Sequence, residues 1–199
     1  KGRALAAALL AAHALFAPLA GAADGAPSAE DVAAARDRLR EGVTLRERGE
    51  TQAAIEKLRV AYTIIPTPVT AVELGKAYIA AGRILDAREL CLSVRRIAVH
   101  PEETARSQGA REEAARLAVE LEPRIPSLKI ALELPKGATA SVVIDDAPVL
   151  VESLADPRKT NPGHHVLVAR AGEGPEERVE VDLAEGESKD VKLAPKWVP

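Results

Sequence analysis

The feature that most constrains this chain is a repeat of 33 residues in its first half. Five residue pairs recur at that spacing, and their members are small, turn-forming or apolar. The pairs are Gly42 and Gly75, Leu45 and Tyr78, Gly49 and Gly82, Ala54 and Ala87, and Leu58 and Cys91. A repeat of this length indicates one supersecondary unit that buries its apolar face against its neighbour. The first half should therefore be an array of paired helices.

This pattern resembles the tetratricopeptide repeat (TPR), a helix-turn-helix unit of about 34 residues with small residues where its helices touch. The resemblance covers residues 35–101, and Pro66 stands where the family ends a unit. The chain departs from the family at Arg38, Glu41 and Val94, where Trp, Leu and Ala are usual. The resemblance implies a helical solenoid whose concave wall binds a partner.

Start and stop signals divide this half into five predicted helices. Ser28 and Asp31 have the spacing of a capping box, while Thr67-Pro68 and Pro101 are start signals. The predicted helices span 30–48, 51–64, 68–81, 84–98 and 102–121. The last should cap the array through one apolar stripe formed by Ala105, Gly109, Leu117, Ala118, Leu121 and Ile125.

Beyond Pro126 the composition changes to short Val- and Ile-rich runs between Gly, Pro and Asp pairs, which predict strands and turns. The predicted strands are Ser127–Leu134, Ala140–Ile144, Val149–Val151, His164–Arg170, Arg178–Leu183 and Ser188–Leu193. Pro135-Lys136-Gly137-Ala138 and the later Pro162-Gly163-His164 resemble motifs of the PEGA domain, a small β-sandwich of bacterial envelope proteins. A carboxypeptidase-regulatory-like or other immunoglobulin-like sandwich is the alternative.

The first 22 residues predict export. Lys1 and Arg3 precede an Ala- and Leu-rich run, and small residues follow in Ala20-Gly21-Ala22. This order is typical of a secretory signal peptide. A His and a Pro leave the run shorter than the ~20 apolar residues that span a bilayer. We expect cleavage near Ala22, a periplasmic or secreted protein, and no stable membrane span.

Together these signals predict a multidomain α and β protein, with an N-terminal α-helical TPR-like solenoid and a C-terminal all-β, immunoglobulin-like or PEGA-like sandwich. The predicted parts are a signal peptide at 1–22, a flexible segment at 23–29, helical repeats with a capping helix at 30–125, the sandwich at 126–195 and a tail at 196–199.

The sequence favours binding over catalysis. A formal charge of −3 disfavours nucleic acid as a partner, and the chain has no phosphate-binding Gly loop, Gly-x-Ser-x-Gly elbow or His-Glu-x-x-His pattern. Cys91 occupies a core position of the repeat, and adjacent His164 and His165 should point to opposite faces of a strand. Asp145-Asp146 is expected in a hairpin turn. We therefore predict no catalytic residue, no metal site and no cofactor.

The expected function is that of a non-enzymatic exported adaptor or scaffold in a bacterial cell envelope. It would bind a protein or peptide partner that carries acidic groups, and the sandwich would act as a spacer or surface module. The alternatives are a carbohydrate-binding accessory module on a cell-envelope polymer, or a regulatory subunit of an envelope enzyme. Concave positions of the resembling repeats, carried over residue by residue, predict partner contacts at Arg36, Leu39, Val43, Arg46, Val69, Val72, Lys76 and Ile79.

Overall fold

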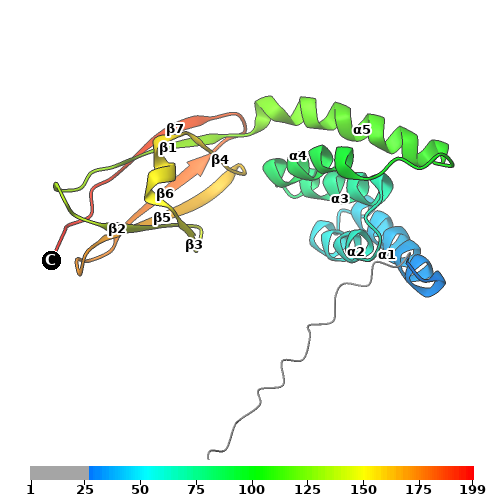
Figure 1. The fold of residues 1–199 in the computed structure, drawn as a ribbon, viewed down its shortest axis with the longest axis horizontal. Coiled ribbons are helices and arrows are strands. Elements are labelled where there is room, and N and C mark those ends of the chain that lie inside the picture. Colours follow the sequence, from blue (N-terminus) through cyan, green and yellow to red (C-terminus); the bar gives the residue numbers. More distant parts are fainter. Residues whose placement is uncertain (1–26) are drawn as a thin grey trace, which may run out of the picture.

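The computed structural model describes residues 27–199, which form five α-helices followed by seven β-strands. The helices gather at one end of the molecule and the strands at the other (Figure 1). The protein is therefore a mixed α and β structure over these residues. The predicted signal peptide lies outside the described residues, as does most of the segment at 23–29. The helices are α1 Ala29–Glu47, α2 Thr51–Ile64, α3 Pro68–Ala80, α4 Ile84–Ser93 and α5 Ala105–Leu121.

Local capping explains where the first helices begin and end. The Ser28 hydroxyl accepts a hydrogen bond from the Asp31 N–H, and the Asp31 carboxylate accepts one from the Ser28 N–H, each at 3.1 Å. Thr67 caps α3 in the same reciprocal manner. Gly49 and Gly82 follow α1 and α3 with φ of 78° and 74°, a conformation that glycine adopts without strain. The predicted capping box, the Thr67 cap and the two glycine turns are confirmed.

The two helix pairs repeat one packing arrangement. Gly42 in α1 lies so close to α2 that a Cβ atom there would be 2.5 Å from Leu58 Cγ. Gly75 in α3 faces α4 in the same way, and a Cβ atom there would be 3.4 Å from Cys91 Sγ. Leu58 and Cys91 are both buried. The residues that repeat in the sequence therefore make equivalent contacts in the two pairs.

The bounds predicted for the last two helices need correction. The α4 helix ends at Ser93 and a short 3-10 turn, Val94–Arg96, follows, so the helix does not reach residue 98. The α5 helix begins at Ala105 rather than at 102, because the Thr104 hydroxyl accepts a hydrogen bond from the Ser107 N–H and caps the helix there. The predicted start signal Pro101 lies in the preceding turn.

Arg111 holds this connection in place. Its guanidinium donates to the carbonyl oxygens of Val94 and Ile97 at 3.2 and 3.0 Å, and to that of Ala98 at 2.8 Å. It also pairs with the Glu103 carboxylate at 2.8 Å. Carbonyl groups at a helix end lack partners inside the helix, and Arg111 supplies donors to them from α5.

The buried stripe of α5 also differs from the prediction. Ala105 and Gly109 are exposed. Small buried residues at four-residue spacing let α5 lie close to α3 and α4, since residues four apart share one face of a helix. The buried positions on α5 are Ala110, Ala114, Ala118 and Leu121.

The strands form two sheets, with orders β4-β1-β7 and β3-β2-β5-β6. β1 and β7 are parallel, with Ser127 opposite Ser188, and the other pairs are antiparallel. The two sheets share one apolar core that includes Leu128, Leu193, Val142 and Leu167. The strands are β1 Ser127–Leu132, β2 Ala140–Ile144, β3 Ala147–Val149, β4 Arg158–Lys159, β5 Gly163–Ala171, β6 Glu177–Leu183 and β7 Ser188–Leu193.

The predicted strand at Val149–Val151 is displaced. Asp145 and Asp146 both have positive φ, at 48° and 64°, and form a two-residue turn. Such a turn pairs its flanking residues directly, so the partner strand begins at Ala147. A 3-10 turn, Val151–Ala155, follows, and the short strand β4 was not predicted. The expected Asp145-Asp146 hairpin turn is confirmed.

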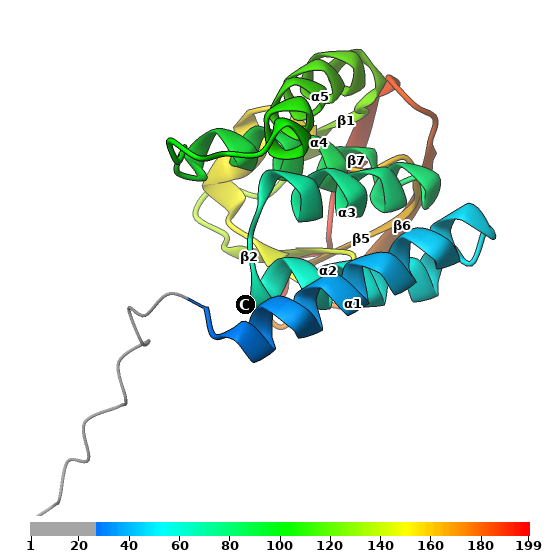
Figure 2. The ribbon, with the colours of Figure 1, turned by 90° about the vertical axis from the view of Figure 1, so that its right-hand side faces the viewer.

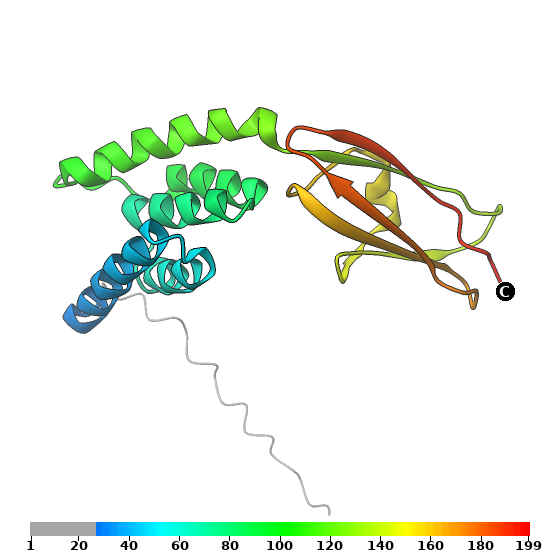
Figure 3. The ribbon, with the colours of Figure 1, turned by 180° about the vertical axis from the view of Figure 1, so that it is seen from behind.

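The helical and strand halves have separate apolar cores, and polar contacts join them. α5 leads through a 3-10 turn at Glu122–Arg124 into β1, as Figure 3 shows from behind. Arg124 makes two hydrogen bonds of 2.8 Å to the Glu185 carboxylate, and its carbonyl accepts from the Gly186 N–H. Asn161 bonds to the start of α4. The domain boundary in this region stays a prediction.

Candidate functional site

A groove runs between α1, α3 and α5, the helices that follow one another in the view of Figure 2. It consists of three adjoining hollows of about 730, 420 and 350 Å³. Arg106 of α5 lines all three, and Arg36 and Leu39 of α1 line the first two. We call this surface the α1-α3-α5 groove.

The structure brings four of the eight predicted partner residues to the wall of this groove without a charged partner. Arg36, Leu39 and Val43 contribute from α1, and Val69 contributes from α3. Leu39 and Val43 are half-buried, because their inner edges also pack against the core of α2 and α3. They therefore form an apolar floor.

The other four predicted residues are less available. Val72 borders the groove but is only 2% exposed. Ile79 packs beside Ile84, where α3, α4 and the end of α5 meet. Arg46 and Lys76 are engaged in ion pairs within the protein. Partner contact by these eight residues stays a prediction.

The ion pairs form a ladder across the three helices. Arg46 of α1 approaches the Glu73 carboxylate of α3 at 3.0 Å, and Lys76 approaches the same carboxylate at 3.1 Å. Lys76 also pairs with Glu113 of α5 at 3.0 Å. These side chains are partly buried, with exposed fractions of 15–32%. The charges of Arg46 and Lys76 are thus balanced by carboxylates of the chain itself.

Arg36 and Arg106 differ from this ladder. Both are exposed, both line the first two hollows, and neither forms an ion pair with any other residue within 27–199. Two unpaired guanidinium groups beside an apolar floor can attract and orient a carboxylate. This end of the groove is its positively charged part.

Sequence reasoning missed Arg106, although the repeat itself contained the signal. Gly109 follows Gly75 by 34 residues, and the same offset places Arg106 at the position of Val72. Val72 in turn corresponds to Leu39 by the 33-residue offset. Extending the concave positions into α5 would therefore have identified Arg106. The offset was not extended because the rest of α5 departs from the repeat.

A further hollow of about 840 Å³ lies at the loops that join α2 to α3 and α4 to α5. Ile65, Pro66 and Ile97 give it apolar walls, and Glu103 and Arg111 lie at its edge as a pair. The Glu103 pKa is lowered, first by the hydrogen bond from Ser107 and then by Arg111. This carboxylate is engaged by the loop structure, so we assign no binding to it.

Cys91 lies at the bottom of the contact between α3, α4 and α5 and is 2% exposed. Burial raises the pKa of its thiol from 9.0 to about 11, and the nearby Glu113 carboxylate adds to the rise while Lys76 opposes it. A thiol must lose its proton to act as a nucleophile. The environment therefore suits a packing residue and not a reactive one.

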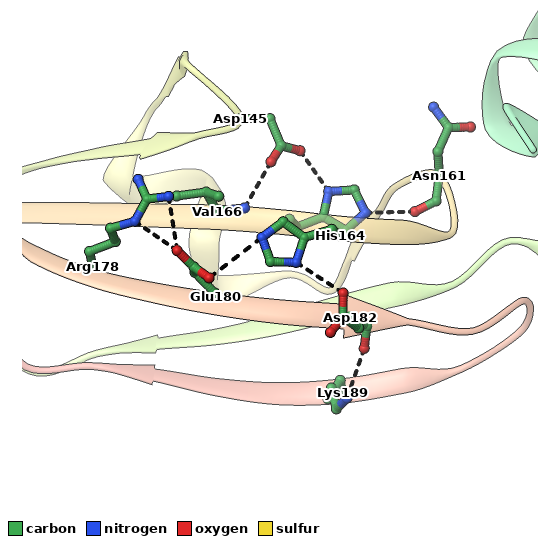
Figure 4. Close-up of polar contacts among 9 residues, drawn as sticks. Asp145, Asn161, His164, Val166, Arg178, Glu180, Asp182 and Lys189 are labelled. Carbon is green, nitrogen blue, oxygen red and sulfur yellow. Dashed lines mark hydrogen bonds and ion pairs between the residues drawn. The ribbon is translucent and has the colours of Figure 1, made fainter.

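The two adjacent histidines point to opposite faces of β5, as Figure 4 shows. His164 is exposed and its Nδ1 lies 2.9 Å from Asp182. His165 is buried and its Nδ1 lies 2.6 Å from Asp145. They cannot bind one ion together, and no group of three or more His, Cys, Asp or Glu within 27–199 has metal-binding geometry.

Comparison of the chain with models of known protein families, with curated proteins and with solved structures found no match. Among the helices of residues 27–199, none combines the length and the apolar character that crossing a membrane requires.

Proposed function

We propose that this protein is a non-enzymatic adaptor that binds a protein or peptide partner in the α1-α3-α5 groove. The observation that carries the proposal is the pair of unpaired guanidinium groups, Arg36 and Arg106, beside the apolar floor of Leu39, Val43 and Val69. The partner is an extended segment or helix that alternates apolar and acidic side chains. Apolar contact supplies most of the affinity, and the carboxylates fix the register.

The architecture behind this proposal is a TPR-like solenoid followed by an immunoglobulin-like or PEGA-like sandwich. Equivalent contacts of Gly42 and Gly75, one repeat apart, support the first part. Two sheets with one shared core support the second, together with the Pro-Gly turn before β5. The strand half acts as a spacer or surface module.

The proposed setting is the bacterial cell envelope, in the periplasm or outside the cell. The signal-like order of residues 1–22 supports export, and the PEGA-like motifs support the envelope. N-terminal sequencing of protein recovered from the envelope tests this part, with a start near Ala23 as the expected result.

Peptide display against the purified protein tests the binding function. We expect the enriched peptides to combine apolar residues with Asp or Glu. A labelled peptide of that class should bind the Arg36→Glu/Arg106→Glu variant at least about tenfold more weakly, because like charges across an interface repel. Fluorescence anisotropy at fixed ionic strength measures the change.

The matched control is the Arg59→Glu/Arg96→Glu variant. It makes the same charge change at exposed positions of α2 and of the 3-10 turn after α4, outside the groove. This control should keep wild-type affinity. Enrichment of neutral or basic peptides, or equal losses in both variants, would contradict the proposal.

A further inference from the structure

His165 is a buried titratable group at the junction of the two halves. It lies on β5, its side chain is 7% exposed, and both of its ring nitrogens have partners. Nδ1 is 2.6 Å from the Asp145 carboxylate and Nε2 is 2.8 Å from the backbone carbonyl oxygen of Asn161 (Figure 4). Neither the adaptor function nor the groove uses this group.

Both partners of the ring are acceptors. A backbone carbonyl has no hydrogen to donate. The second oxygen of the Asp145 carboxylate already accepts the Val166 N–H at 2.9 Å. A neutral imidazole has only one N–H, whereas an imidazolium has two. The arrangement therefore satisfies all its polar groups when His165 is positively charged beside the Asp145 carboxylate.

Asn161 transmits this contact to the helical half. Its side-chain oxygen accepts a hydrogen bond of 2.8 Å from the Leu85 N–H, and its amide donates to the Asp86 carboxylate at 3.0 Å. Leu85 is in the first turn of α4, where no nearby side chain caps the helix. Asn161 thus caps α4 from the other half of the molecule.

The surrounding charges leave His165 with one close counter-ion. On the helical side, Asp86 is balanced by Arg83 at 2.7 Å. On the opposite face of β5, the exposed His164 lies near Asp182 and Glu180, at 2.9 and 3.7 Å. The groups that face the buried ring directly are the Asp145 carboxylate and the Asn161 carbonyl.

We infer that His165 is a pH-sensitive latch between the two halves. In its charged form it holds the Asn161 backbone, and the Asn161 side chain holds the start of α4. When the ring loses a proton, the remaining hydrogen stays at Nδ1, because a carboxylate is the stronger acceptor. The Asn161 carbonyl then loses its donor and the cap on α4 weakens. Because histidine ordinarily changes charge between about pH 5 and 8, the latch is complete on the acidic side and loosens as pH rises.

Hydrogen exchange of the Leu85 amide in the full chain reports the latch directly, since the hydrogen bond of that amide is the one made to Asn161. After correction for the intrinsic exchange rate, we expect its protection to fall by about tenfold between about pH 5.5 and 8, the effect of losing one hydrogen bond to a charged group. The Leu167 amide in the strand core should keep its protection, which separates a local release from unfolding.

Two variants decide the origin of the pH dependence. His165→Gln should give weak Leu85 protection at both pH values, because glutamine carries no titrating charge. His164→Gln is the matched control on the opposite face and should keep the wild-type pH dependence. The inference is overturned if Leu85 protection in the wild type is the same at both pH values. It is overturned equally if the change persists in His165→Gln or disappears in His164→Gln.

Discussion

At the scale of single residues, three glycines occupy equivalent places in the helices that line the groove but have different surroundings. Gly42 faces the Leu58 side chain and backbone of α2. Gly75 faces Cys91 at an ordinary contact distance, and Gly109 has open space where its Cβ would be. Only the first two are followed by a second helix that packs against them. The same residue therefore has a packing reason at one end of the array and none at the other.

Substituting alanine at these positions should give opposite results. We expect Gly42→Ala to destabilise the protein by about 1–3 kcal/mol, because the new methyl group collides with Leu58 and the core must shift. Gly109→Ala should stabilise it by about 0.5–1 kcal/mol through helix propensity alone. Urea unfolding followed by circular dichroism measures both. Equal signs for the two variants would contradict this account.

The buried thiol of Cys91 should make stability depend on alkaline pH. Its pKa is raised from 9.0 to about 11 in the folded protein, chiefly by burial. The folded state then holds its proton more tightly than the unfolded state does, so the stabilising contribution is present below about pH 9 and is lost between about pH 9 and 11. A two-unit shift corresponds to a loss of about 2–3 kcal/mol.

Cys91→Ala is the reference for this measurement, because it removes the titrating group and leaves the tyrosines and lysines unchanged. The difference in unfolding free energy between wild type and variant should shrink as pH rises from 9 to 11. A constant difference over that range would mean that the thiol titrates alike in both states.

At the scale of elements, the local signals predicted the helices and strands well. Four of five predicted helices begin within one residue of the observed start, because Ser28, Thr67, Gly49 and Gly82 act through their immediate neighbours. The start of α5 was missed because Pro101 resembles a start signal while the Thr104 hydroxyl is the actual cap. Local chemistry is visible in a sequence, but competing caps must be weighed in three dimensions.

The features that could not be predicted join residues far apart in the chain. Arg46 and Lys76 stand at concave positions, but their carboxylate partners Glu73 and Glu113 are on other helices or other turns. Asn161 lies 75 residues or more from the α4 residues that it contacts. A sequence shows which charges exist and not which of them meet. The free cations of the groove were therefore identifiable only once these pairs had been located.

The ladder of ion pairs should stabilise the array and not only line its surface. Replacing Arg46 and Lys76 together by Glu would place like charges beside Glu73 and Glu113, and we expect a loss of about 1–4 kcal/mol, between the values for surface and buried pairs. Arg36→Glu/Arg106→Glu makes an equal charge change at exposed positions and should alter the thermal midpoint little.

Thermal unfolding of the two double variants side by side measures this contrast. If Arg46→Glu/Lys76→Glu unfolds at the wild-type temperature, the ladder contributes no net stability. Both residues would then be as available to a partner as Arg36 and Arg106 are.

At the scale of the whole molecule, the helices and the sheets bury their apolar residues separately. The helical clusters contain residues between Ala54 and Ile125, and the strand cluster contains residues between Leu128 and Leu193. Polar contacts cross between them, through Arg124 and Glu185 and through Asn161 and α4. Contacts of this kind orient two bodies without making the fold of either depend on the other.

Separating the halves tests this arrangement. A fragment of residues 27–126 should keep its helical circular dichroism and unfold cooperatively, because its core is complete. Its unfolding free energy should be lower than that of the helical half in the full chain by about 1 kcal/mol, since α4 loses the cap that Asn161 provides. Introducing Asn161→Ala into the full chain should reproduce that loss without any cut. If the fragment is unfolded, the two halves depend on each other; if Asn161→Ala has no effect, the cap contributes nothing to the coupling between them.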